Sequence, residues 1–337
     1  RKLFAPFFTP RGIAQYAGMI RDESDNVLRK WDRFVDKEEY IDVSEDMLRF
    51  SARVILKTVF SVESDEHILS VSNDVETALA FSGVQRRALF KKPLWWPSPT
   101  VQNYKQAYER LRRFVADLIA QRRAMPEEEW PVDILSKMLL TRDEQSGRVL
   151  SDTLIFDNCM TLFVAGHETT ARSLAFSLYL LSQNPDVEEK LIEEVDRVLG
   201  EKPVDVAVLK EMPYTLQVIK ETLRLYPIAA FYPRDLIKGD VLDDYPLATG
   251  QTVMLFPYAT HRHPELWENP DHFDPDRFTP EAEAARHPYA YAPFAAGRRV
   301  CIGNNFSLLE SQIFLVSLYR RFRVQLRPCL LYTSPSP

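Results

Sequence analysis

The stretch FAAGRRVCIG, residues 294–303, decides the fold of this chain. Gly297 and Gly303 bound a loop that contains Cys301, just before the last predicted helix. Backbone amides at a helix N-terminus, the helix dipole and a nearby arginine all favour a thiolate over a thiol. A lone cysteine is more often a small buried apolar residue. In this context we expect an anionic ligand instead, and the glycines let the backbone pass close to a flat partner.

Apolar periodicity upstream of this loop predicts a mainly helical chain. A long helix opens with a start signal at residues 151–153 and meets no proline before Pro185. A second helix is predicted over 185–199. A third begins near Pro213 and must end before Pro227, because proline blocks its continuation.

The helical period fades between Ile228 and Phe256, where proline, glycine and acidic residues separate short apolar runs. This segment is predicted to form a small β region. Residues 257–293 are rich in proline and aromatic side chains without clear periodicity, so we expect an irregular but packed segment. A final helix follows the cysteine loop, with Phe306 and Ile313 on one face.

Composition excludes several classes of protein. Hydrophobic residues make up 45% of the 337 residues and charged ones 27%, an ordinary globular balance. With 42 basic and 48 acidic residues, the net charge is -6, and no basic tract suggests a nucleic-acid partner. The longest apolar stretch, 161–181, contains His167, Glu168 and Arg172, which predicts a buried helix rather than a membrane span.

The three cysteines, Cys159, Cys301 and Cys329, are too few and too scattered for a disulfide framework. Thiols suit a reducing compartment, so we expect a cytoplasmic protein.

Two further patterns carry chemistry. Glu221 and Arg224 stand three residues apart on one helical face, where they can pair, although such a pair is usually only a solvated surface feature. Residues 165–170 read AGHETT in the middle of the long helix. Glycine and two threonines around an acid are poor material for a helix interior, because glycine and threonine are poor helix formers, and strain of this kind often marks a site.

The motif in residues 294–303 resembles the heme-binding signature of the cytochrome P450 superfamily. The matching positions are Phe294, Gly297, Arg299, Cys301 and Gly303. This resemblance implies the cytochrome P450 fold and heme b (iron protoporphyrin IX) as cofactor. It also implies that Cys301 is the proximal iron ligand, that Phe294 packs beside the sulfur, and that Arg299 binds a heme propionate.

The resemblance assigns roles to the other patterns as well. Glu221 and Arg224 form a buried ion triad with Arg277 of the Pro-Asp-Arg-Phe motif, and this triad is structural. Arg234 and Arg1 match positions that meet heme propionates, although both could be surface charges.

Residues 165–170 match the segment that widens over the distal face of the heme, and such widening has a known form, the π-bulge. Glu168 and Thr169 match the acid and alcohol that order water and deliver protons during oxygen activation. His167 does not match a ligand position. A zinc site at His261 and His263 is dismissed, because two loop histidines without further ligands are weak evidence.

The function implied is a monooxygenase that inserts one atom of O₂ into an apolar substrate such as a fatty acid or terpene. Electrons would come from a separate reductase or ferredoxin, since the chain has no flavin or iron–sulfur motif. The alternatives are a peroxide-driven heme-thiolate peroxygenase and a non-catalytic heme sensor or carrier. The expected substrate pocket is apolar. Its candidate residues are Phe163, Ala165, Ile228, Ala229, Ala230 and Phe231.

The resemblance runs over residues 1–327, which we expect to be one domain that lacks the family's N-terminal portion and with it any membrane anchor. Residues 328–337 form a Ser/Pro-rich segment without periodicity, which we expect to be a non-native tail. Cys329 and Tyr332 are therefore given no functional role.

Overall fold

The computed structural model describes residues 4–35, 37, 39–87, 93–142, 147 and 149–327. Arg1 and the predicted tail, 328–337, lie outside the described residues. The expectations for both stay predictions.

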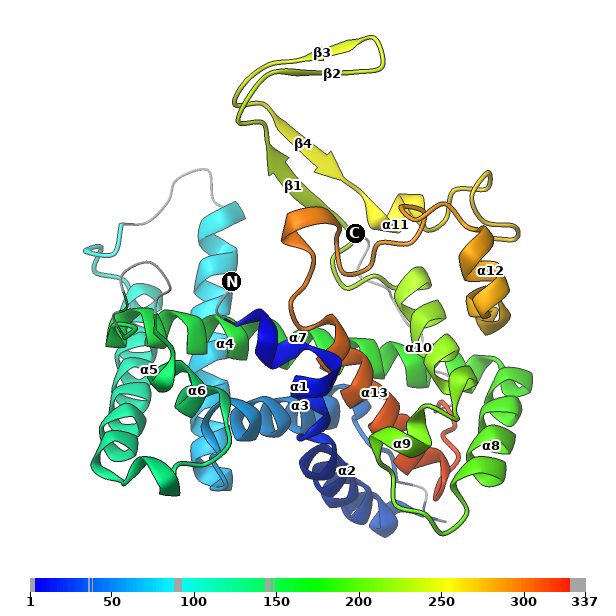
Figure 1. Cartoon of the computed structure of the whole chain (residues 1–337), viewed down its shortest axis with the longest axis horizontal. Coiled ribbons are helices and arrows are strands. Elements are labelled where there is room, and N and C mark those ends of the chain that lie inside the picture. The colour runs from blue at the N-terminus through cyan, green and yellow to red at the C-terminus, as the bar shows by residue number, and fades with distance from the viewer. Residues whose placement is uncertain are drawn as a thin grey trace. The chain divides into compact units, whose positions relative to one another are not determined.

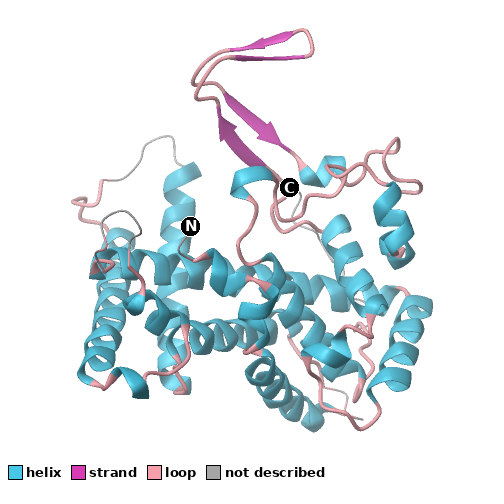
Figure 2. Cartoon of the chain, in the orientation of Figure 1, coloured by secondary structure: helices cyan, strands magenta, loops and turns pink. Residues whose placement is uncertain are grey.

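Helices dominate the described chain, and the strands are few and short (Figure 2). This confirms the prediction of a mainly α fold with a small β region. The α-helices, labelled in Figure 1, are α1 (Pro10–Ala14), α2 (Ala17–Trp31), α3 (Val43–Phe60), α4 (Asp65–Arg87), α5 (Pro99–Ala124), α6 (Ile134–Leu140), α7 (Asp152–Gln183), α8 (Pro185–Leu199), α9 (Val206–Leu209), α10 (Pro213–Leu225), α11 (Pro257–Thr260), α12 (Pro280–Ala285) and α13 (Asn304–Tyr319). Short 3₁₀ turns are η1 (Ala5–Phe8), η2 (Asp32–Phe34), η3 (Glu127–Glu129), η4 (Pro275–Phe278) and η5 (Gly297–Arg299).

The β region falls where the sequence places it, between Ile228 and Phe256. Strand β1 (Tyr232–Asp235) pairs antiparallel with β4 (Thr252–Leu255), and β2 (Asp240–Leu242) pairs antiparallel with β3 (Tyr245–Leu247). Each pair is a separate two-stranded sheet.

The chain divides into two compact units. The first comprises Arg1–Phe7 and Glu45–Thr169, and the second Phe8–Ser44 and Thr170–Pro337. Helix α7 belongs to both, with the division after Thr169.

The first unit contains α3, α4, α5, α6 and the first part of α7, and α4 packs along α5. Gly166 of α7 faces Ile55 of α3 so closely that an added Cβ would lie 2.9 Å from the Ile55 side chain. The glycine therefore permits close approach of two helices.

One expectation for this part of α7 is wrong. Helix α7 continues as an α-helix through residues 165–170, without the predicted π-type widening. The hydroxyl of Thr169 donates to the carbonyl of Ala165 at 2.7 Å, so this polar side chain is satisfied within the helix.

The second unit is built on α10, which packs against α8, α13 and η4, while α13 also packs along α2. The bounds of α8 and α10 agree with the prolines that predicted them. Glu194 of α8 caps the N-terminus of α10. Its carboxylate accepts hydrogen bonds from the backbone amides of Tyr214 and Thr215, both at 2.8 Å. An acid at a helix N-terminus also complements the helix dipole.

No helix in the described part of the chain is both long enough and apolar enough to cross a bilayer.

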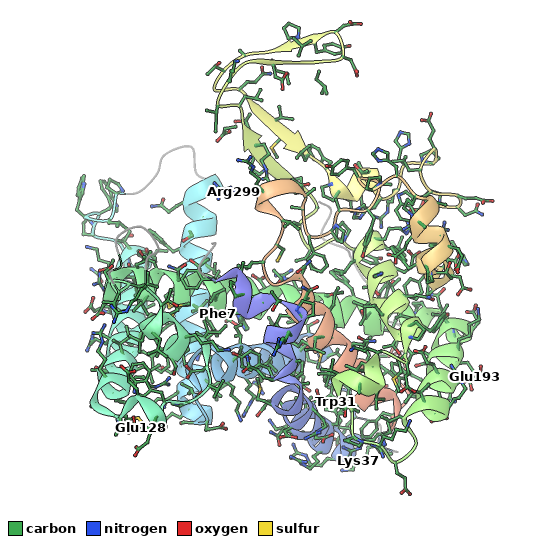
Figure 3. The ribbon with its side chains drawn as sticks, viewed as in Figure 1. Phe7, Trp31, Lys37, Glu128, Glu193 and Arg299 are labelled. Carbon is green, nitrogen blue, oxygen red and sulfur yellow. The ribbon has the colours of Figure 1, made fainter. Side chains whose placement is uncertain are left out.

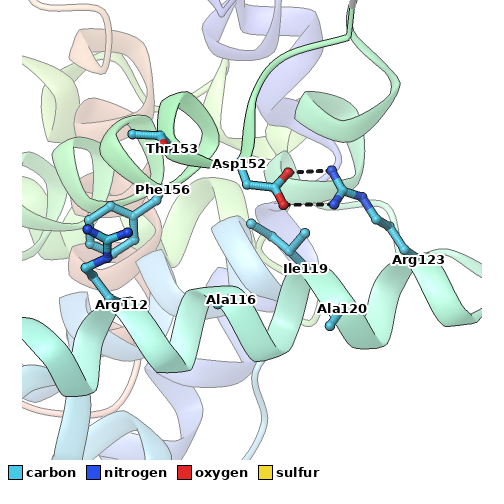
Figure 4. Close-up of a pocket in the computed structure, with 8 residues that line it drawn as sticks. All are labelled: Arg112, Ala116, Ile119, Ala120, Arg123, Asp152, Thr153 and Phe156. Carbon is cyan, nitrogen blue, oxygen red and sulfur yellow. Dashed lines mark hydrogen bonds and ion pairs between the residues drawn. The ribbon is translucent and has the colours of Figure 1, made fainter.

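Two neighbouring arginines of α5 make ion pairs in opposite surroundings. Arg122 is buried and donates to both carboxylate oxygens of Asp133, at 2.9 and 2.8 Å, and Asp133 also accepts from Ser61 at 2.9 Å. Arg123 pairs with Asp152 at the rim of a small cleft of about 180 Å³ between α5 and the start of α7 (Figure 4), and both side chains are exposed.

Asp133→Ala should lower the free energy of unfolding by about 3 to 5 kcal/mol, because it leaves Arg122 buried without a counter-charge. Asp152→Ala is the matched control and should cost about 0 to 1 kcal/mol, since its pair is exposed. Denaturant titration of both variants measures the difference. Equal losses would contradict the assignment of Arg122 and Asp133 as a buried structural pair.

Candidate active site

The cysteine loop is the segment 294–303, and its backbone is held by its own hydrogen bonds. The amide of Cys301 donates to the carbonyl of Phe294 at 2.8 Å, which closes the loop, and the amide of Val300 donates to Gly297 at 3.1 Å. Gly297 has φ +68° and Ala295 has φ +59°. The left-handed conformation at two nearby positions turns the chain sharply and explains the glycine at 297.

Cys301 lies two residues before Gly303, the N-cap of the 16-residue helix α13, and its side chain is exposed. A Cβ added at Gly303 would lie 4.0 Å from the Cys301 sulfur, so the absence of a side chain keeps the surroundings of the sulfur open. An exposed sulfur at a helix N-terminus, on a loop with no bulky neighbour at 303, fits a thiolate ligand to a flat metal complex.

Arg298 and Arg299 lie on η5 and are both exposed, and Figure 3 labels Arg299 on this turn. Phe294, at the start of the loop, is half-buried. The loop therefore combines a sulfur donor with guanidinium groups, which suit carboxylates such as heme propionates.

The structure brings Glu221, Arg224 and Arg277 together. Arg224 forms a two-pronged pair with Glu221, through bonds of 2.6 and 2.7 Å, and both side chains are completely buried. The Arg277 Nε lies 3.5 Å from Glu221, and its Nη2 donates to the carbonyl of Asn269 at 3.0 Å. Burial raises the pKa of the Glu221 carboxyl, and Arg224 opposes that shift.

Arg224 also organises the irregular segment that precedes the cysteine loop. Its guanidinium donates to three backbone carbonyls, those of His261 at 2.8 Å, Pro270 at 2.6 Å and His272 at 3.0 Å. The amide of Asp274 donates to Glu221 at 3.0 Å. One ion pair on α10 thus fixes four points of the backbone between residues 257 and 293.

Sequence reasoning missed the role of His261. Its ring is completely buried, and it joins the backbone of Arg224 to that of Ala292. Its pKa is lowered to about 4, mainly by burial; the hydrogen bond to the Arg224 backbone opposes this shift, and the charges of Arg224 and Arg262 add to it. The only sequence signal was a histidine in an irregular segment, which does not reveal two partners 31 and 37 residues away.

An aromatic cluster supports the same segment. Trp267, Phe278 and Ala290 are buried, and Tyr291 packs against them. Arg286 lies over the Trp267 ring, 4.2 Å from its centroid.

The candidate proton-relay residues lie at the end of the first unit. Thr169 is exposed and Glu168 half-buried on α7, whereas Thr170 is buried and its hydroxyl lies 3.1 Å from that of Ser307 on α13. The two adjacent threonines therefore have different surroundings.

Phe163 and His167 are both buried on α7 and stack on each other with ring centroids 5.4 Å apart. Burial lowers the pKa of His167. Ala165, by contrast, is exposed.

The other pocket candidates follow α10. Ile228 and Ala230 are half-buried, while Ala229 and Phe231 are exposed, and the Phe231 ring lies 5.7 Å from that of Phe256. Arg234 of β1 lies over the ring of Tyr232 and donates to the carbonyl of Pro233 at 2.8 Å. Its partners as described are thus in its own strand.

A sequence model of the cytochrome P450 family matches residues 1–329. Among curated proteins, the chain is 32% identical to cyclooctatin synthase of Streptomyces melanosporofaciens, over 96% of this chain and 70% of that protein. It is 29% identical to cytochrome P450 4V2 of Mus musculus, over 96% and 66% of the two chains. It is 30% identical to the chloroplastic protein LUTEIN DEFICIENT 5 of Arabidopsis thaliana, over 97% and 58%.

Among solved structures, the heme domain of cytochrome P450DA superposes with a TM-score of 0.87 at 29% identity, covering 96% of this chain and 70% of that one. This confirms the predicted fold. The chain thus spans between 58% and 70% of the length of these four relatives.

Arg224→Met should destabilise the protein by about 3 to 5 kcal/mol, because it leaves the Glu221 carboxylate buried without its partner. Arg277→Met should destabilise the protein less, since the contact of Arg277 with Glu221 is longer and the Arg277 side chain is not fully buried. Arg298→Met, at an exposed site, should stay within about 0.5 kcal/mol of the wild type. Thermal unfolding ranks the three, and an equal loss in all of them would refute the hierarchy.

Proposed function

The chain belongs to the cytochrome P450 family, and from this premise we propose that it is a heme-dependent monooxygenase. One atom of O₂ is inserted into an apolar organic substrate, and the other is reduced to water. The balance requires two electrons, which a separate redox partner supplies, and two protons. The observation that carries this proposal is the exposed Cys301 thiol at the N-terminus of α13, on a loop closed by its own hydrogen bonds.

Cys301 is proposed as the heme ligand. When bound, the heme supplies the activation of O₂, and a thiolate ligand favours cleavage of the O–O bond. The helix dipole of α13 and the cationic residues Arg298 and Arg299 on the same loop favour the thiolate form of Cys301. Arg299 and Arg234 are proposed to hold the heme propionates, because guanidinium groups bind carboxylates in a two-pronged geometry. Phe294 is proposed to pack beside the sulfur.

Glu168 and Thr169 are proposed to pass protons to the reacting oxygen through water. The exposure of Thr169 supports this role, because its hydroxyl can meet water while it also donates to Ala165. A carboxylic acid one residue away can replenish the protons.

The substrate is proposed to be apolar, of the size of a fatty acid or terpene. The exposed apolar side chains of Ala229 and Phe231, which follow α10, support an apolar substrate. One relative, 29% identical, is named cyclooctat-9-en-7-ol 5-monooxygenase, and its name specifies an alcohol substrate with a carbon–carbon double bond.

A reductase or ferredoxin is proposed as the electron donor. Arg298 is exposed on the cysteine loop, where a charge mainly affects the rate of association with a partner.

Cys301→Ser should abolish the red-shifted carbon monoxide band from which the family takes its name, because serine cannot supply a thiolate. Difference spectra of the heme-loaded protein measure this. Cys159→Ser is the control: Cys159 is buried 3.8 Å from the Met138 sulfur, and burial raises its pKa to about 12, so it is no candidate for a thiolate. A Cys301→Ser variant that keeps the band with unchanged heme content would refute the ligand assignment.

Thr169→Ala should retain heme and bind substrate but divert NADPH consumption from product to hydrogen peroxide. We expect the ratio of product to NADPH to fall roughly tenfold or more, a low estimate for loss of a proton-transfer group. Thr170→Ala should keep that ratio and instead lower stability by about 1 kcal/mol, through the lost bond to Ser307. Product, NADPH and peroxide are measured with an added redox partner. Unchanged coupling in Thr169→Ala would favour the peroxide-driven alternative.

A further inference from the structure

We infer that His261 is a positioning residue for the cysteine loop, which it connects to the end of α10 through both nitrogens of a neutral ring. The inference rests on the proposed role of Cys301 as the heme ligand. The contacts of His261 that support it do not depend on that role, because they are hydrogen bonds within the protein.

The two partners of the ring fix its tautomer. The backbone amide of Ala292 is a donor, and it lies 2.9 Å from Nε2 of His261, so Nε2 must accept. Nδ1 therefore carries the hydrogen of the neutral ring, and it donates to the carbonyl of Arg224 at 3.1 Å. A protonated ring would lose the bond to Ala292, because Nε2 would then be a second donor facing a donor.

His261 and Arg224 hold each other reciprocally. The Arg224 side chain donates to the carbonyl of His261 at 2.8 Å, while the His261 side chain donates to the carbonyl of Arg224. The ring is also stacked on Tyr291, with centroids 5.4 Å apart, and the Tyr291 hydroxyl donates to the carbonyl of Lys220 at 2.9 Å. The hydrogen bond of the ring to Arg224 and its stacking on Tyr291 therefore both connect His261 to α10.

From Ala292 the connection reaches Cys301 in two further hydrogen bonds. The carbonyl of Ala292 accepts from the amide of Ala295 at 3.2 Å, which closes the turn in which Ala295 has φ +59°. The carbonyl of the preceding residue, Phe294, accepts from the amide of Cys301 at 2.8 Å. Release of Ala292 should therefore loosen the turn that sets the position of Cys301.

The surroundings keep the ring neutral. Arg224 and Arg262 are the cations that face it, Tyr291 covers it, and the carboxylate of Glu221 is already paired with Arg224. The pKa is about 4 in the folded chain against 6.5 ordinarily, so the unfolded chain takes up a proton first as the pH falls. Stability is therefore lost from about pH 6.5 down to about pH 4, and below that the folded ring itself becomes protonated.

The test compares three variants of the heme-loaded protein by hydrogen exchange and by the carbon monoxide band. His261→Phe keeps a ring for stacking on Tyr291 but loses both hydrogen bonds. His261→Asn keeps an amide donor near the Nδ1 position but cannot reach Ala292. His263→Asn changes the exposed histidine two residues along and serves as the control.

Both His261 variants should show roughly tenfold faster amide exchange at Ala292, the change expected from one lost hydrogen bond, with exchange in α8 unchanged. The thiolate band should shrink in parallel. In the wild type, protonation of the His261 ring on acidification should reduce the thiolate band. This acid-dependent loss should be absent from His261→Asn, because an amide does not titrate. His263→Asn should match the wild type in all three respects.

Wild-type exchange at Ala292 in both His261 variants would overturn the inference. Faster exchange with an unchanged thiolate band would overturn it too, because the loop would then loosen without moving the ligand. Equal acceleration of exchange throughout the second unit would also contradict it, since His261 would then only stabilise the fold. Failure of the proposed function is separate: it appears as a thiolate band that survives Cys301→Ser.

Discussion

The buried pair of Arg224 and Glu221 is the interaction on which the second unit depends. Burying two charges costs more than their attraction returns unless every remaining donor and acceptor is satisfied. The guanidinium meets this condition by binding Glu221 and three backbone carbonyls, and the carboxylate also accepts from Asp274. The ion pair therefore gives the segment 257–293 a defined path although that segment contains little regular secondary structure.

The position of the cysteine loop depends on this ion pair and on the segment 257–293 that it holds in place. Helix α13 provides the dipole that favours an anionic sulfur, but a helix N-terminus alone does not determine where the residues before it lie. That position comes from the packed segment upstream, through Ala292 and the closing bond between Cys301 and Phe294. A residue far from the sulfur in sequence, such as His261, can therefore affect it without touching it.

Much of the fold follows from local chemistry in the sequence. Prolines predicted the starts of α8 and α10, and the loss of helical period predicted the β region. What could not be predicted depends on tertiary contacts between distant residues. Three features depend on such contacts: the burial of Arg122 but not of Arg123, the close approach of Ile55 to Gly166, and the two partners of His261. The motif around Cys301 indicates a ligand, but motifs do not show which backbone atoms hold it.

The central claim is that Cys301 binds the heme iron through its sulfur, and X-ray absorption at the iron edge tests it most directly. The heme-loaded protein should show one sulfur in the iron coordination sphere together with the four porphyrin nitrogens. This sulfur should be absent when Cys301 is replaced by serine and present when Cys159 is. A wild-type spectrum that requires only nitrogen and oxygen neighbours would contradict the account.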